Sequence, residues 1–187
     1  DEAGQLINTL FGNTSIHNDV ELHDVRLPAD IVTTFGGPNH GLQALRRRVG
    51  AEGYAMTCGA LKPQGLSPQA LGDLARRLAR GGLDFIKDDH GLADQVYSPF
   101  EERVRACAEA VQEANAISGG RTRYVPSLSG NLDQLRRQLD IAAEAGIDTV
   151  LIAPMIVGLP ALHTLARRPG LARPDGSSLP PRDPTDA

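Results

Sequence analysis

The chain has 187 residues, enough for one ordinary domain, and its formal net charge is −4 with a pI of about 5.7. This charge argues against a nucleic-acid or anionic-membrane partner, and no apolar run approaches the ~18 residues that a membrane span needs. No charged segment followed by an apolar one opens the chain, so we expect a cytoplasmic protein without a signal peptide. We expect the widely spaced Cys58 and Cys107 to be reduced thiols.

The first 37 residues have the pattern of the tail of a separate N-terminal domain. An apolar run with turn residues spans 6–16, and 20–28 alternates between apolar and polar residues like an edge strand. Residues 28–50 contain proline and glycine breaks and a short helix, which is typical of a connector. Because the sequence starts without methionine, we expect it to be part of a longer protein.

From residue 49 the sequence alternates between strand-like and helix-like segments. Short apolar strands are predicted within 54–63 and over 83–87, 122–128 and 148–154. Helices are predicted over 67–82, 99–120 and 131–146. This alternation predicts an α/β protein with a parallel sheet and about four βα units. No glycine fingerprint follows the first strand, so a dinucleotide-binding fold has no specific support.

Chemically active side chains follow the first two predicted strands. Lys62 comes after the first strand, and Lys87, Asp89 and His90 end the second. Ligand sites of parallel α/β folds lie at the carboxyl ends of the strands. Of the 19 basic residues only Lys62 and Lys87 are lysines, and an amine that must lose its proton cannot be replaced by arginine. The sequence therefore predicts a site at this end of the sheet.

The end of the chain has a different composition. Residues 167–187 are rich in Pro, Gly, Ser and Asp without apolar periodicity, and we expect them to be a disordered tail. About four βα units cannot close an eight-stranded barrel. We therefore expect the chain to be a fragment of a longer protein.

The segment "ALKPQGLSPQALGDLARRLARGGLDFIKDDHGLADQVYSPFEERV" closely resembles the large subunit of ribulose-bisphosphate carboxylase/oxygenase (RuBisCO), and most of all its non-carboxylating relatives, the RuBisCO-like proteins. The resemblance extends to "FGN" and "LPADIVTTFGGPNHG" before it and to "APMIVGLPALHTLA" after it. It implies that 1–37 end an α+β N-terminal domain and that 38–166 form the first half of a (β/α)8 TIM barrel. It also implies a homodimer with shared active sites.

The resemblance also implies roles for individual residues. Lys87 matches the lysine that forms a carbamate with carbon dioxide, and Asp89 matches the aspartate that binds magnesium beside it. His90 stands where the family usually has a glutamate as third metal ligand. Lys62 matches the active-site lysine that handles substrate protons. Asn13 matches an asparagine that reaches the partner subunit's site.

The implied chemistry is proton removal next to a carbonyl of a phosphorylated keto-sugar or keto-acid. A magnesium ion held by oxygen ligands would stabilise the enediolate, and a carbamate turns a lysine into an oxygen ligand. Isomerase, enolase-type and transcarboxylase/hydrolase activities share this first step, and "KPQGLSP" and "APMIVGLP" favour the last, acting in sugar-acid catabolism. A true carboxylase and an inactive truncated remnant are the alternatives.

Several residues differ from the carboxylase pattern or have a plainer interpretation. Gln64 stands where the carboxylase has a second lysine and Ala60 where it has a threonine, which argues against carboxylation. His90 is an imidazole in place of a carboxylate, which suits manganese, iron or zinc better than magnesium, and it is equally well explained as a loop residue. We expect Asp88 to be structural and Met155 to lie in the core.

Overall fold

The computed structural model describes residues 2–35 and 41–167. The predicted disordered tail falls outside these residues except for Arg167, and the predicted domain boundary after residue 37 also falls outside them. The helices and strands are, in chain order, α1 (Ala3–Ile7), η1 (Asn8–Gly12), α2 (Ala29–Phe35), α3 (Leu42–Val49), β1 (Cys58–Leu61), α4 (Pro68–Arg80), β2 (Phe85–Asp88), η2 (His90–Leu92), α5 (Phe100–Ser118), β3 (Arg123–Val125), α6 (Leu132–Glu144), α7 (Pro154–Val157) and α8 (Leu159–Ala166).

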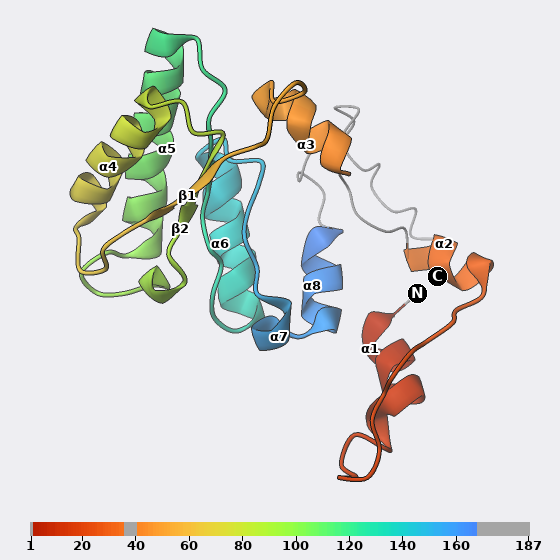
Figure 1. The fold of residues 1–187 in the computed structure, drawn as a ribbon. Helices are drawn as coiled ribbons and strands as arrows, with labels where there is room; N and C mark the ends of the chain where they lie inside the picture. Colours follow the sequence, from red (N-terminus) through yellow and green to blue (C-terminus); the bar gives the residue numbers. More distant parts are fainter. Residues whose placement is uncertain (1, 36–40, 168–187) are drawn as a thin grey trace, which may run out of the picture.

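The predicted parallel α/β arrangement is confirmed. The strands form a sheet in the order β1-β2-β3, and both pairs are parallel (Figure 1). Leu61 lies opposite Asp88, and Lys87 lies opposite Val125. This register ends β1 and β2 at the same level, so the residues that follow them meet at one edge of the sheet.

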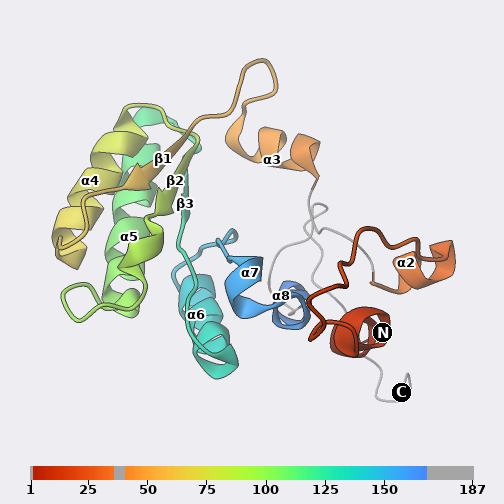
Figure 2. The same ribbon diagram turned by 60° about the horizontal axis from the view of Figure 1, so that its bottom comes forward.

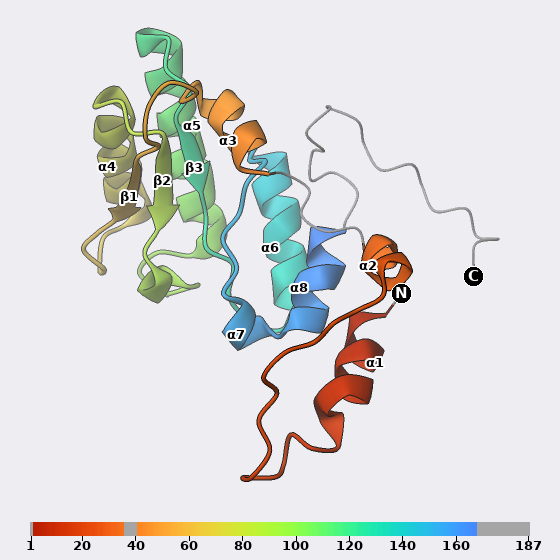
Figure 3. The same ribbon diagram turned by 45° about the vertical axis from the view of Figure 1, so that its right-hand side comes forward.

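Helices α4 and α5 pack against each other and cover one face of the sheet (Figure 3). Ser67 caps α4 by accepting a hydrogen bond from the Ala70 N–H, and Pro68 occupies its first turn, as the sequence predicts. A side chain at Gly72 would place its Cβ 3.1 Å from the Ala106 carbonyl oxygen of α5, a tight contact that glycine avoids, so Gly72 favours the close approach of the two helices. The fully buried Ile86 of β2 lies in the core beneath these helices.

The predicted fourth strand, 148–154, is not formed as a strand. One parallel bridge joins Ser127 to Leu151, with the Leu128 N–H donating to the Leu151 carbonyl at 2.9 Å. Pro126 has no N–H to extend the ladder, and Pro154 begins helix α7. The described residues therefore form three strands with a short extension rather than four strands.

The N-terminal prediction was wrong in detail. Residues 20–28 form no strand, because the described part of the chain offers them no neighbouring strand to pair with. The apolar run before them is helical: Glu2 caps α1 by accepting hydrogen bonds from the N–H groups of Gly4 and Gln5, and η1 continues it. This helix contacts α8 (Figure 2).

No helix in the described ranges is long and apolar enough to cross a membrane.

The burial of Ile86 predicts a large stability effect. We expect Ile86→Ala in the full-length protein to lower the free energy of unfolding by about 2–5 kcal/mol, because it leaves a cavity under α4 and α5. The matched control is Ile117→Ala in α5, whose side chain is 66% exposed and whose loss is expected to cost less than about 0.5 kcal/mol. Urea denaturation measures both, and equal losses would contradict this account of the core.

Candidate functional site

The ends of β1 and β2 bring Lys62 and Asp89 together, as predicted. Lys62 directly follows β1 and Asp89 directly follows β2, and the Leu61–Asp88 pairing places them side by side. The Lys62 Nζ lies 3.7 Å from the Asp89 Oδ1. The Lys62 side chain is 66% exposed and the Asp89 side chain 19% exposed, so the cluster opens to solvent on the lysine side.

Gln64 holds the second oxygen of Asp89. Its Nε2 donates a hydrogen bond to the Asp89 Oδ2 at 3.2 Å. A Cβ on Gly91 would overlap the Gln64 amide, so the glycine leaves the space that this amide occupies. The hydrogen bond from Gln64 lowers the pKa of Asp89, and the positive charges of Lys62 and Lys87 lower it further against the effect of partial burial. Asp89 is therefore kept as an oriented carboxylate.

Lys87 lies in the central strand, on the face turned away from α4 and α5. Successive side chains of a strand point to opposite faces, and in β2 Ile86 and Asp88 are buried while Lys87 is half-buried. The Lys87 Nζ donates to the carbonyl oxygen of Asp88 at 3.1 Å. The amine of Lys87 is thus held at the carboxyl end of β2, where its charge acts on Asp89.

Asp88 points the other way and forms a buried ion pair with Arg103 of α5. Both side chains are 0% exposed, and the Arg103 Nε lies 3.3 Å from the Asp88 Oδ2. The Tyr124 hydroxyl donates to the Asp88 Oδ1 at 2.7 Å, and the Ser127 N–H donates to Oδ2 at 3.2 Å. The expectation that Asp88 is structural agrees with this network, which ties β2 to α5 and to the segment after β3.

Arg103 also supports the loop that follows β2. Its Nη1 donates to the Ser98 carbonyl at 2.7 Å and its Nη2 to the Ala93 carbonyl at 2.6 Å. Ala93 has a φ of 40°, which is unusual for a residue with a side chain. One arginine therefore fixes both the strand end that carries Lys87 and the turn that follows Asp89.

Burial dominates the acid–base behaviour of this network. It raises the pKa of Asp88, although Arg103 and the Tyr124 hydroxyl favour its ionised form. It also raises the pKa of Tyr124 and raises that of the neighbouring Cys107 thiol to about 12. Cys107 and Tyr124 therefore keep their protons at neutral pH and act as structural groups.

The structure does not bring the side chains of His90 and Asn13 into contact with the cluster around Asp89. His90 is exposed at the start of η2, and it contributes a backbone hydrogen bond to Asp89. Asn13 is exposed at the end of η1, and the α1–η1 helix lies on the far side of α8 from β1 and β2 (Figures 1 to 3). Over residues 2–35 and 41–167, no three His, Cys, Asp or Glu side chains gather as candidate metal ligands.

Sequence reasoning missed two supports of the site and misplaced one residue. Nothing in the spacing of Arg103 distinguishes it from Arg105, the other arginine of α5, since its partner Asp88 is fifteen residues earlier in the chain. For Tyr124, nothing in the sequence except its position in a predicted strand indicated its contact with Asp88. Met155, expected in the core, is 95% exposed in α7.

Comparison with known proteins gives a consistent result. The family profile described as the ribulose bisphosphate carboxylase large chain, catalytic domain, matches residues 28–171. The chain is 61% identical to the 5-methylthioribulose-1-phosphate isomerase of Rhodospirillum rubrum over 173 residues. This matched region covers 91% of this chain and 46% of that protein. It is also 54% identical over 166 residues to ribulose bisphosphate carboxylase-like protein 1 of Rhodopseudomonas palustris, a match that covers 89% of this chain and 45% of that protein.

A solved structure agrees with these sequence relatives. The crystal structure of a RuBisCO-like protein from Rhodopseudomonas palustris superposes with a TM-score of 0.82 at 57% identity, over 88% of this chain and 47% of that one. The chain thus spans about half the length of the proteins that it matches.

The buried ion pair predicts a stability difference between two arginines of one helix. Arg103→Met leaves the Asp88 charge buried without its partner, and we expect it to cost the full-length protein about 3–5 kcal/mol of unfolding free energy. Arg105→Met in the same helix removes ion pairs to Glu101 and Glu144 from a side chain that is 49% exposed, so its expected cost is below about 1 kcal/mol. Chemical denaturation compares the two variants, and an equal loss would refute the assigned role of Arg103.

Proposed function

The chain belongs to the RuBisCO large-chain family, with RuBisCO-like proteins among its relatives, and on that basis we propose that the full-length protein enolises a phosphorylated keto-sugar. The observation that supports this most is the cluster at the carboxyl ends of two adjacent parallel strands. There Lys62 and Gln64 hold the two oxygens of Asp89, 3.7 Å and 3.2 Å away. Such strand ends carry the chemistry of parallel α/β enzymes.

The donor set fits a magnesium ion only if Lys87 contributes an oxygen. Asp89 is an oriented carboxylate, and hard cations prefer oxygen ligands. No other described carboxylate, histidine or cysteine set gathers beside it. Lys87, half-buried on the same strand end, would supply oxygens as a carbamate, and we propose that Lys87 and Asp89 are ligands with His90 as a third. When bound, the cation would stabilise negative charge on the substrate oxygens.

Lys62 is the candidate for moving the substrate proton. Its side chain extends into solvent, where a substrate can approach, while Asp89 keeps its amine near the strand end. An amine in this position can exchange a proton with the carbon or oxygen next to the substrate carbonyl. Gln64 keeps the carboxylate fixed during this transfer, since its amide neither gains nor loses a proton.

The isomerase reaction is the finer activity that we propose. A relative named 5-methylthioribulose-1-phosphate isomerase is 61% identical, which favours a five-carbon keto-sugar 1-phosphate as substrate. The predicted transcarboxylase/hydrolase activity in sugar-acid catabolism stays a prediction. Neutral Gln64 in place of the carboxylase lysine argues against a carboxylase. If the unchanged full-length protein takes up no deuterium in the exchange experiment below, the inactive remnant is the remaining alternative.

The remaining expectations concern the whole protein. We propose that 38–166 form the first half of a TIM barrel and that 1–37 end an α+β domain. The wide separation of η1 from β1 and β2 supports a homodimer in which Asn13 serves the partner subunit's site (Figure 3). A cytoplasmic location is consistent with the phosphorylated substrate.

Replacement of Lys87 tests the proposal directly. We expect Lys87→Ala in the full-length protein to abolish magnesium-dependent solvent deuterium uptake by 5-methylthioribulose 1-phosphate, because the carbamate oxygens are lost. The matched variant Lys87→Arg keeps the positive charge but cannot form a carbamate, and it should be equally inactive. Mass spectrometry of the substrate measures uptake, and unchanged thermal unfolding confirms folding. Near-normal exchange in either variant would refute the role of Lys87.

The role of His90 requires a separate measurement. If His90 is a ligand, His90→Glu adds an anionic oxygen to the site. The ratio of magnesium affinity to zinc affinity should then rise about tenfold or more over that of the unchanged protein. Calorimetric titration of the full-length protein at fixed pH and bicarbonate compares the variant with the unchanged protein. Equal dissociation constants would remove His90 from the ligand set and leave Lys87 and Asp89.

A further inference from the structure

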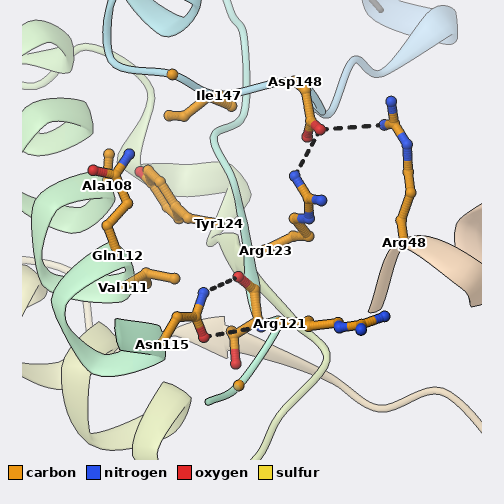
Figure 4. Close-up of a pocket in the computed structure, with 13 residues that line it drawn as sticks. Arg48, Ala108, Val111, Gln112, Asn115, Arg121, Arg123, Tyr124, Ile147 and Asp148 are labelled. Atoms are coloured by element: carbon orange, nitrogen blue, oxygen red, sulfur yellow. Dashed lines mark hydrogen bonds and ion pairs between the residues drawn. The ribbon is translucent and has the colours of Figure 1, made fainter. Parts of the chain in front are cut away.

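A second pocket lies at the opposite end of the sheet from Lys62 and Asp89. It has a volume of about 470 Å³ and lies between the second half of α5, the start of β3 and the segment after α6 (Figure 4). Its polar wall contains Arg48, Arg121 and Arg123 with a single carboxylate, Asp148. A volume of this size suits a small organic ligand.

The single carboxylate is shared by two of the arginines. The Asp148 Oδ2 lies 2.7 Å from the Arg123 Nη1 and 3.4 Å from the Arg48 Nη1, and both side chains point toward it in Figure 4. The Thr149 hydroxyl donates to the Oδ1 at 3.0 Å. Asp148 thus fixes two guanidinium groups but neutralises only one charge.

Arg121 adds a third positive charge that no described residue neutralises. Its side chain lies over Gly50, whose Cβ position would be 3.6 Å from the Arg121 Cδ, and it forms no hydrogen bond or ion pair with residues 2–35 or 41–167. The run Arg46 to Arg48 has the sequence of a solvated helix face, yet the Arg48 side chain is only 18% exposed. The tertiary structure therefore gathers arginines that are 73 and 75 residues apart in sequence.

The balance of charge in the pocket is positive. Three guanidinium groups and one carboxylate leave an excess of two charges. Helices α5 and α6 end nearby at Ser118 and Glu144 without basic residues in their last turns, and each helix end contributes about half a negative charge. An excess of about one positive charge remains, which favours an anionic ligand over a neutral one.

The wall opposite the arginines is apolar and firmly held. Val111, Ile147 and the ring of Tyr124 line it (Figure 4). Asn115 both donates to the Thr122 carbonyl at 2.9 Å and accepts from the Thr122 N–H at 3.1 Å, which fixes the end of α5 against the segment before β3. The pocket therefore presents donors for an anion on one side and a rigid apolar surface on the other.

From this arrangement we propose that the pocket binds a monophosphate ester with an apolar or aromatic substituent. The planar guanidinium fork of Arg121, with help from Arg48 and Arg123, would hold the phosphate oxygens, because arginine donors match phosphate geometry. The substituent would lie against Val111 and Ile147. This ligand site is separate from the strand ends that carry Lys62 and Asp89, and it does not depend on the proposed enolisation.

The experiment uses phenyl phosphate as probe and the full-length protein in calorimetric titrations. We expect Arg121→Gln to weaken phenyl phosphate binding about tenfold or more, because it removes charge-assisted hydrogen bonds to the phosphate oxygens. Arg121 has no ion pair to lose within the described chain, so the variant should fold normally. Inorganic phosphate should bind more weakly than phenyl phosphate, since it leaves the apolar wall uncovered.

Two further variants separate this site from general charge effects and from the strand ends. Arg77→Gln removes the same charge from an exposed position in α4 and should leave phenyl phosphate affinity unchanged. Lys62→Ala should also leave it unchanged. Equal affinity of Arg121→Gln and the unchanged protein would overturn the proposal, as would equal losses in Arg121→Gln and Arg77→Gln. Loss of binding in Lys62→Ala alone would place the phosphate at the strand ends and overturn it as well.

Discussion

The buried ion pair between Asp88 and Arg103 is the interaction on which the arrangement of the candidate site depends. Two charges removed from water cost several kcal/mol unless each is fully paired. Here the carboxylate also accepts hydrogen bonds from Tyr124 and the Ser127 N–H, and Arg103 donates to two loop carbonyls as well as to Asp88. The network therefore selects one position for the end of β2 relative to α5.

That position has a direct consequence for chemistry. Side chains alternate along a strand, so fixing Asp88 toward α5 turns Lys87 toward the opposite face of the sheet. Asp89 then begins the turn that Arg103 supports, and Gln64 and Lys62 reach it from the neighbouring strand end. The face of β2 that contacts the helices therefore stabilises the fold, whereas the other face carries a polar cluster that is open to solvent.

The two ends of the sheet carry different kinds of polar groups. At the carboxyl ends a carboxylate is surrounded by lysines and an amide, a combination suited to moving protons and, with the proposed carbamate on Lys87, to holding a cation. At the amino ends three arginines face one carboxylate and an apolar wall, a combination suited to an anion. Parallel strands produce this separation because all of them expose their carboxyl ends on the same side.

The sequence by itself determined the parallel α/β class, the family, and the placement of Lys62, Lys87 and Asp89 at one end of the strands, because these follow from local periodicity and from contiguous motifs. It did not determine that 148–154 would form only one bridge, that 20–28 would form no strand, or that Met155 would be exposed, because each depends on neighbours distant in the chain. Only the tertiary structure paired Asp88 with Arg103 and brought three arginines into one pocket with Asp148. Ion pairs and pockets are set by packing in space, and no spacing along the sequence encodes them.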